Sequence, residues 1–156
     1  MHKEKDYKIS LNRIKSYCAL QDRCQFDVLK KLTDWGLQKR TQENILKALI
    51  IDDFINEKRF AASFCRGKFK IKNWGKHKII TQLKSKNISA ELINAGLKEI
   101  DENEYEKILE KLFYQKKETL NEKNKFKQNI QIAKFLIQRG FENNLVWTKI
   151  KELSNK

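Results

Sequence analysis

The residues of this chain best suited to chemistry are cations. Between positions 58 and 90 stand ten lysines and arginines and no aspartate or glutamate. At about 100° per residue, Arg59, Ser63, Arg66 and Lys70 share one stripe of a helix, apart from the apolar positions. Like charges this dense repel one another, and a polyanion relieves the repulsion when its counterions are released. The segment therefore predicts contact with phosphate groups.

Ten basic side chains are the candidates for contact with an anionic partner. They are Arg59, Arg66, Lys68, Lys70, Lys72, Lys76 and Lys78, with Lys30, Lys84 and Lys86 as secondary candidates. Gly75 is expected to begin a helix, and the partial positive charge of a helix start favours phosphate. For Trp74 the sequence leaves two interpretations open, which are stacking on a base or sugar and packing at a helix junction.

Two other interpretations of the charge remain, a solvated basic face and an anionic membrane surface. The net charge of the chain is +14, so a purely solubilising surface is a real alternative. No helical pattern pairs a basic face with a Trp- and Leu-rich face, as interfacial helices do. No apolar run approaches the roughly 18 residues of a membrane span, and no apolar h-region follows the charged first residues. We expect a cytoplasmic protein.

Signals of catalysis are missing from the sequence. There is no G-x-x-x-x-G-K-[ST], H-E-x-x-H or G-x-S-x-G motif, and histidine occurs twice. Asp52 and Asp53 are adjacent, so on a helix their side chains would diverge. The acidic stretch 99–106 indicates a solvated hinge or helix start, with a metal site as the lesser alternative. We expect no enzyme activity, no cofactor and no metal.

Composition indicates an all-α protein. The chain of 156 residues has no proline and five glycines, whereas β proteins need turn residues every 8–12 positions. Long stretches of the chain consist of Leu, Ile, Lys, Glu, Gln and Ala, which favour helices, Ile more weakly than the others. Cys18, Cys24 and Cys65 lack the spacing of a zinc site or a disulfide framework, so we expect small core residues.

An internal repeat divides the chain. The apolar pattern that starts at Leu83 returns at Leu136, 53 residues later, and a third copy starts at Leu32 with an insertion in its second half. The predicted units are 1–55, with an N-terminal extension, 56–101 and 102–156, each a three-helix repeat. Because one unit buries little surface alone, stacking into an elongated, curved array is expected. A compact bundle of duplicated ancestry is the alternative.

Helix ends are predicted within these units. Gly36, Asn87 and Gly140 suit the left-handed conformation that closes a helix. Thr41 and Ser89 are the expected N-caps of the third helices of the first two units. The first helix of the chain is expected over about 10–22.

Two stretches of the sequence resemble the RecX family of recombination regulators. The first, 17–36, is similar to a family segment in which an arginine, here Arg23, precedes a "…EL…KL…G" helix. The second covers 54–61 and 72–88 and resembles "…DD.RFA…" followed by "…G…I…L..KGI". Together they cover about half of the chain. Asn56-Glu57 replaces the usual acidic pair, and Asn87 replaces the glycine of "KGI".

The resemblance implies both a fold and a function. RecX proteins consist of tandem three-helix repeats that bind the RecA recombinase filament and suppress its ATPase and strand exchange, in DNA recombination, repair and the SOS response. The implied partners are a RecA-type filament and the DNA within it, and we expect a monomer. The ten cations above would then contact filament or DNA. A general DNA- or RNA-binding helical repeat protein without a recombinase partner is the alternative.

Overall fold

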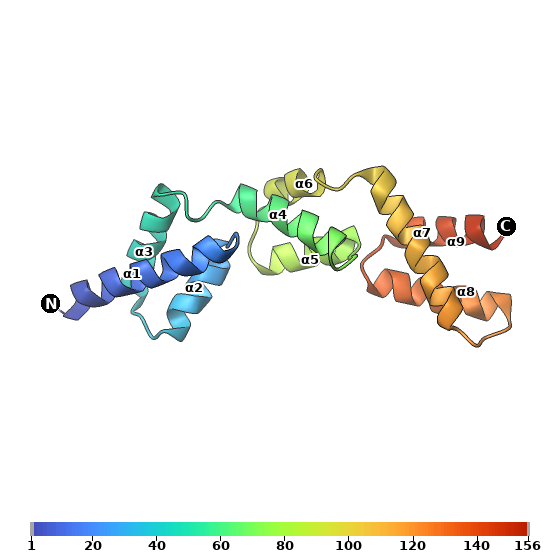
Figure 1. Cartoon of the computed structure of the whole chain (residues 1–156), viewed down its shortest axis with the longest axis horizontal. Helices are drawn as coiled ribbons and strands as arrows, with labels where there is room; N and C mark the ends of the chain where they lie inside the picture. Colours follow the sequence, from blue (N-terminus) through green and yellow to red (C-terminus); the bar gives the residue numbers. More distant parts are fainter. Residues whose placement is uncertain (1, 156) are drawn as a thin grey trace.

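The computed structural model describes residues 2–155, with side chains from Asp6 onward, and all regular secondary structure in this range is helical. The helices are α1 His2–Leu20, α2 Gln25–Asp34, α3 Lys39–Ile51, α4 Glu57–Lys70, α5 Lys76–Ser85, α6 Ala90–Leu97, α7 Glu102–Thr119, α8 Lys125–Gln138 and α9 Asn143–Ser154. They follow one another along an elongated body with the termini at opposite ends (Figure 1). The predicted all-α array is confirmed. The outermost predicted positions, 1 and 156, lie outside the described residues.

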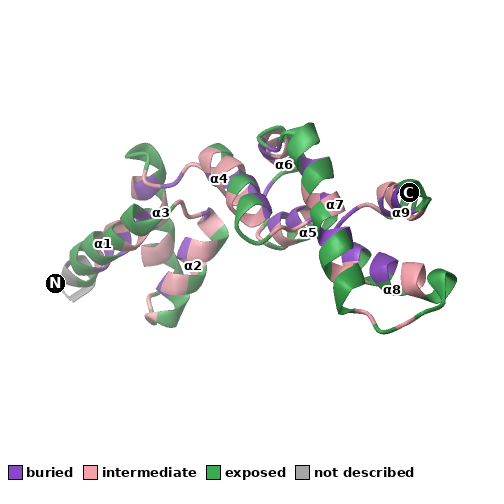
Figure 2. Ribbon diagram, turned by 45° about the vertical axis from the view of Figure 1, so that its right-hand side comes forward, coloured by how far each residue is buried: buried purple, intermediate pink, exposed green. Residues whose placement is uncertain are grey.

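Helices pack in groups of three along the chain. α1, α2 and α3 contact one another, as do α4, α5 and α6, and α7, α8 and α9. Buried residues lie where helices of a group face each other (Figure 2). The predicted unit boundaries fall in the connectors that precede α4 and α7. Each helix thus buries one apolar stripe and leaves the rest of its surface to polar side chains.

One turn recurs in all three groups and follows from the repeat. Gly36, Asn87 and Gly140 have φ angles of 75°, 62° and 108°. The backbone amide of the residue that follows each of them donates to the carbonyl of a leucine five residues earlier, at 3.1–3.3 Å. The pairs are Leu37 to Leu32, Ile88 to Leu83 and Phe141 to Leu136. This is the Schellman closure of a helix. The left-handed positions predicted from the sequence are confirmed.

Two predicted helix starts need correction, and one is confirmed. Gln38, not Thr41, is the N-cap of α3, because the helix starts at Lys39. α1 ends near the expected position but begins at His2, eight residues before the predicted start at 10. Ser89 caps α6 as predicted, its hydroxyl accepting from the Leu92 amide at 3.3 Å.

The second and third groups share one apolar core. Tyr105 of α7 lies between Phe69 of α4 and Phe141 before α9, with ring centroids 5.7 and 5.1 Å away. Its hydroxyl accepts from the Lys76 amide at 2.9 Å and donates to the carboxylate of Glu142. Burial is the largest cause that raises the pKa of Tyr105, and the hydrogen bond to the Glu142 carboxylate is the second. The same core continues without a break through both groups.

Backbone contact tightens this junction further. The Gly75 amide donates to the Arg139 carbonyl at 3.0 Å, and the His77 amide donates to the Gly140 carbonyl at 2.9 Å. A Cβ on Gly75 would stand 2.2 Å from the Gly140 carbonyl carbon, so only glycine permits this approach. The second and third groups are therefore joined as one packed body.

The first group has its own core. Ile14, Val28, Leu32, Ile45 and Leu49 are fully buried there, within a cluster separate from that of the other two groups. The cysteines are buried, as predicted: Cys18 belongs to the first cluster, while Cys24 and Cys65 belong to the second. Burial raises the pKa of Cys24 to about 12 and that of Cys65 to about 11.

Candidate nucleic-acid interface

Acidic side chains from outside the basic segment fold back onto four of the ten predicted cations. The ion pairs are Arg59 with Asp22 and Asp53, Arg66 with Glu99, Lys76 with Glu102, and Lys86 with Asp27, at 2.5–3.4 Å. Every one of these carboxylates lies before position 58 or after position 90. The local charge is therefore lower than the segment alone indicates.

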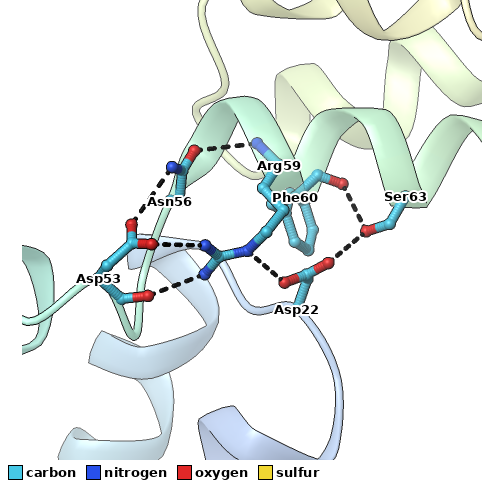
Figure 3. A network of polar contacts seen from close by, with 6 residues as sticks. All are labelled: Asp22, Asp53, Asn56, Arg59, Phe60 and Ser63. Carbon is cyan, nitrogen blue, oxygen red and sulfur yellow. Dashed lines mark hydrogen bonds and ion pairs between the residues drawn. The ribbon is translucent and has the colours of Figure 1, made fainter.

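Arg59 is the most heavily engaged of these cations. Its Nε donates to Asp22 at 2.8 Å, its Nη1 to the Asp53 carboxylate at 3.0 Å and its Nη2 to the Asp53 carbonyl at 3.0 Å (Figure 3). Ser63 donates to the other oxygen of Asp22, and the Asn56 side chain caps α4 by accepting from the Arg59 amide. Hydrogen bonding to Asp22 raises the pKa of Arg59. Arg59 thus connects the first group to the second.

The start of α5 does not offer its amides to a phosphate, contrary to the sequence-based expectation. The first three N–H groups, on Gly75, Lys76 and His77, donate to the Arg139 carbonyl, the Tyr105 hydroxyl and the Gly140 carbonyl. All three partners come from the third group. Packing between repeats, which a single helix pattern does not reveal, uses these donors.

Six of the ten cations take part in no ion pair between described side chains. They are Lys30, Lys68, Lys70, Lys72, Lys78 and Lys84. Lys30, Lys70, Lys72 and Lys84 are exposed, whereas Lys68 and Lys78 are half-buried. These six carry the positive charge of the middle of the molecule that remains available to an anionic partner.

Trp74 packs at the junction, which is one of its two predicted roles. Its ring meets the edge of Phe64 at a centroid distance of 6.5 Å. The ammonium groups of Lys68 and Lys78 lie 5.0 and 4.6 Å from its centroid. Trp74 is only half-buried and lines a surface hollow, so the packing role leaves part of the side chain accessible.

Two hollows meet on the surface between the first and second groups, and we call them together the junction groove. One has a volume of about 390 Å³ and the other about 410 Å³, and they share Gln21, Phe60, Phe64 and Lys68. Tyr17, Arg23, Trp74, Gln82 and Lys86 line the first, and Lys72 lines the second. Cations, aromatic rings and amides thus share one concave surface.

Of the other predicted cations, two line separate hollows. Lys30 lines one of about 420 Å³ beside Phe26 and Glu57, where burial raises the pKa of the Glu57 carboxyl. Lys78 lines a smaller one of about 210 Å³ together with Arg139.

Sequence reasoning missed two arginines of this region as candidates. Arg23 lies in the connector between α1 and α2, and its guanidinium carbon stands 3.7 Å from the Tyr17 centroid. Arg139 donates from Nη2 to the Lys72 carbonyl at 2.7 Å and from Nε to the Asn73 carbonyl at 3.2 Å. Both lie outside the basic segment. The available signals were the family pattern, which includes Arg23, and the position of each arginine beside a helix end.

Comparison with known proteins bears on the family. Residues 56–97 match the family model described as RecX, second three-helix domain. This segment is similar to the second three-helix domain of RecX proteins. The RecX resemblance of the sequence is thereby confirmed, and the matched range holds nine of the ten predicted cations.

Relatives extend the similarity beyond that domain. The chain is 22% identical over 152 residues to the regulatory protein RecX of Prosthecochloris aestuarii, covering 96% of this chain and 97% of the relative. It is 26% identical over 90 residues to the RecX protein of Lactobacillus johnsonii, covering 58% of this chain. The chain matches about a third of the length of that relative, 33%.

Solved RecX structures share the fold. A crystal structure of a regulatory protein RecX superposes with a TM-score of 0.85 at 22% identity, covering 97% of this chain and 74% of that one. RecX from Lactobacillus salivarius gives a TM-score of 0.83 at 22% identity, covering 98% and 99%. Among the described residues, no helix is both long and apolar enough to cross a membrane.

Proposed function

We propose that this chain is a non-catalytic regulator that binds a RecA-type recombinase filament on DNA in the cytoplasm and inhibits its ATPase and strand-exchange activities. The similarity to RecX regulatory proteins supports this assignment. The observation that carries it is a set of six cations that form no ion pair with a described side chain, five in the segment that matches RecX and one on helix α2, on an elongated body. Such a body suits a partner that is itself long and anionic.

The inhibition follows from bridging. An element that contacts neighbouring filament subunits favours the helical state in which all of its contacts form together. ATP turnover and strand exchange require motion between subunits, so a bound bridge slows both. No bond in the nucleotide or the DNA needs to be made or broken by this chain. As a monomer it would act in proportion to the number of subunits it spans.

A charge reversal tests this proposal. Lys70 and Lys72 are exposed and pair with no described carboxylate, so Lys70→Glu with Lys72→Glu changes the charge without breaking an ion pair seen among those side chains. The matched control is Lys47→Glu with Lys111→Glu, two exposed lysines of the first and third groups. ATP hydrolysis by the recombinase on single-stranded DNA is titrated with each protein. We expect the first variant to need at least ~10-fold more protein for half-inhibition, because two phosphate-facing charges are reversed. Equal inhibition by both variants would remove this surface from the interface.

The second candidate is a DNA- or RNA-binding protein without a recombinase partner. The mixture of aromatic rings and cations in the junction groove favours it. A pull-down of recombinase with and without nuclease separates the two functions. Recombinase retained after nuclease treatment supports the filament regulator, and recombinase lost after it supports the general binder.

A further inference from the structure

We propose that the junction groove binds single-stranded nucleic acid, with an unpaired base stacked on the Tyr17–Arg23 pair and the backbone phosphates running along Lys68 and Lys72. This deepens the proposed function, on which it rests for the identity of the nucleic acid as the DNA of a filament. Each hollow of the groove lies within the ~300–1,000 Å³ range of ligand sites. The groove crosses from the first group to the second, so its ligand contacts both.

Arg23 is held ready for stacking. The ring of Tyr17 lies against one plane of its guanidinium, and its Nε donates to the Tyr17 carbonyl at 3.2 Å. Arg23 takes part in no ion pair between described side chains. Arg23 also lines the hollow, so we assign the second plane of its guanidinium to a ligand, because arginine planes are surfaces on which unpaired bases stack. The Nη groups remain as donors for a phosphate.

The charge of the groove favours a phosphodiester. Two carboxylates line it, and each already has a cation of its own: Asp22 accepts from Arg59, and Asp27 accepts from Lys86. Arg23, Lys68 and Lys72 are left uncompensated. Lys68 is kept near the centre of the groove because its ammonium lies 5.4 Å from the Phe64 centroid and 5.0 Å from that of Trp74. A phosphate thus gains three cations and meets no free carboxylate among the described lining residues.

The aromatic and amide groups select a single strand over a duplex. Phe60 and Phe64 give the shared part of the groove an apolar surface, and Gln21 and Gln82 bring amides that can donate to and accept from base edges. In a duplex the base faces are stacked and the edges are paired, so only its backbone could reach the groove. Rings, amides and cations together match an unstacked nucleotide.

Tryptophan fluorescence provides a local test. The ligand is an oligo-dT of about 15 nucleotides, near the upper site size of a single-strand module, and no recombinase is present. In the variant Trp35→Phe with Trp147→Phe, Trp74 is the only tryptophan and lines the groove. In Trp74→Phe the two remaining tryptophans lie outside it. We expect oligo-dT to quench the fluorescence of the first protein and to leave that of the second within a few per cent.

Anisotropy of labelled oligo-dT measures the role of Arg23. We expect Arg23→Gln to weaken binding by at least ~5-fold, the lower end of what one stacked base contributes. Arg40→Gln, which removes an exposed arginine of α3, is the matched control and should bind like the parent. A duplex of equal length should compete at least ~5-fold more weakly than oligo-dT.

Three results would overturn the inference: equal quenching in both tryptophan variants, equal affinity of Arg23→Gln and Arg40→Gln, or equal competition by the duplex. Because these measurements contain only protein and oligonucleotide, their failure leaves the ATPase titration with recombinase intact. Failure of that titration likewise leaves the groove measurements intact.

Discussion

Replacing Gly75 with alanine tests the packing between the second and third groups. The backbone of Gly75 has an ordinary φ of −74°, so alanine meets no conformational penalty there. Its methyl group would instead stand 2.2 Å from the Gly140 carbonyl carbon and from the Phe141 nitrogen. Both are backbone atoms, which cannot turn aside as a side chain does. Relief requires the two groups to separate.

The cost of that separation can be worked from the structure. Forced overpacking of a closed core costs about 1–3 kcal/mol. Moving the groups apart also weakens the hydrogen bonds from the Gly75 and His77 amides to the third group, each worth about 1 kcal/mol. We expect Gly75→Ala to lower the free energy of unfolding by about 3–5 kcal/mol. At this chain length the Tm falls by about 6–20 °C.

Gly67→Ala is the matched control. Gly67 lies inside α4, and a Cβ built there meets nothing within 4 Å. Alanine in a helix interior is favoured over glycine by roughly 0.5–1 kcal/mol, so this variant should be slightly more stable than the parent. Urea unfolding followed by circular dichroism at 222 nm compares the three proteins. A Gly75→Ala protein within about 1 kcal/mol of the parent would refute the backbone contact and the packing deduced from it.

Two further perturbations address the junction of the first and second groups. Burial raises the pKa of the Glu57 carboxyl, so its ionisation lowers the stability of the folded protein as the pH rises through that pKa. Glu57→Gln should therefore unfold at a higher urea concentration than the parent at pH 7. Below about pH 4, where Glu57 is protonated in the folded and the unfolded protein, the variant and the parent should unfold at the same urea concentration. Lower stability of this variant than of the parent at pH 7 would contradict the upward direction of the pKa shift of Glu57. Arg59→Gln leaves Asp22 and Asp53 without their partner and should lose about 1–2 kcal/mol in low salt, less than a buried pair because the side chain is 39% exposed, with a smaller loss in high salt. The stability of Lys58→Gln, which changes an exposed neighbour, should stay within about 0.5 kcal/mol of the parent. An equal loss of stability in both variants would show that the ion pairs of Arg59 do not stabilise the junction.

Much of the fold could be predicted because residues close together in the sequence determine the features that repeat. A left-handed residue after a helix needs glycine or asparagine, and Gly36, Asn87 and Gly140 satisfy that need at matching places. The error at Thr41 has a physical reason too. The sequence offers a good capping side chain there, but the Schellman turn at Gly36 directs the chain so that α3 starts at Lys39.

The candidate site was less accessible to sequence reasoning, because ion pairs join residues far apart in the chain. Arg59 reaches Asp22 across 37 positions and Lys86 reaches Asp27 across 59. A count of charges along the segment cannot register either pair. Arg23 was missed because it lines one hollow with Lys68 and Trp74 only through the docking of the first group on the second.

Because the interior is divided into two separate cores, the joint between the first and second groups differs in stiffness from the joint between the second and third groups. Changing the angle at the first joint exchanges ion pairs such as Arg59–Asp22 for water and salt ions, and among the described buried apolar side chains of the first group it moves only Cys24 out of the other core. Changing the angle at the second would pull Tyr105 away from Phe69 and expose apolar surface to water. A long partner would thus meet a stiff two-thirds of the molecule and an N-terminal third that adapts to its pitch, with the ease of that adaptation set by ionic strength.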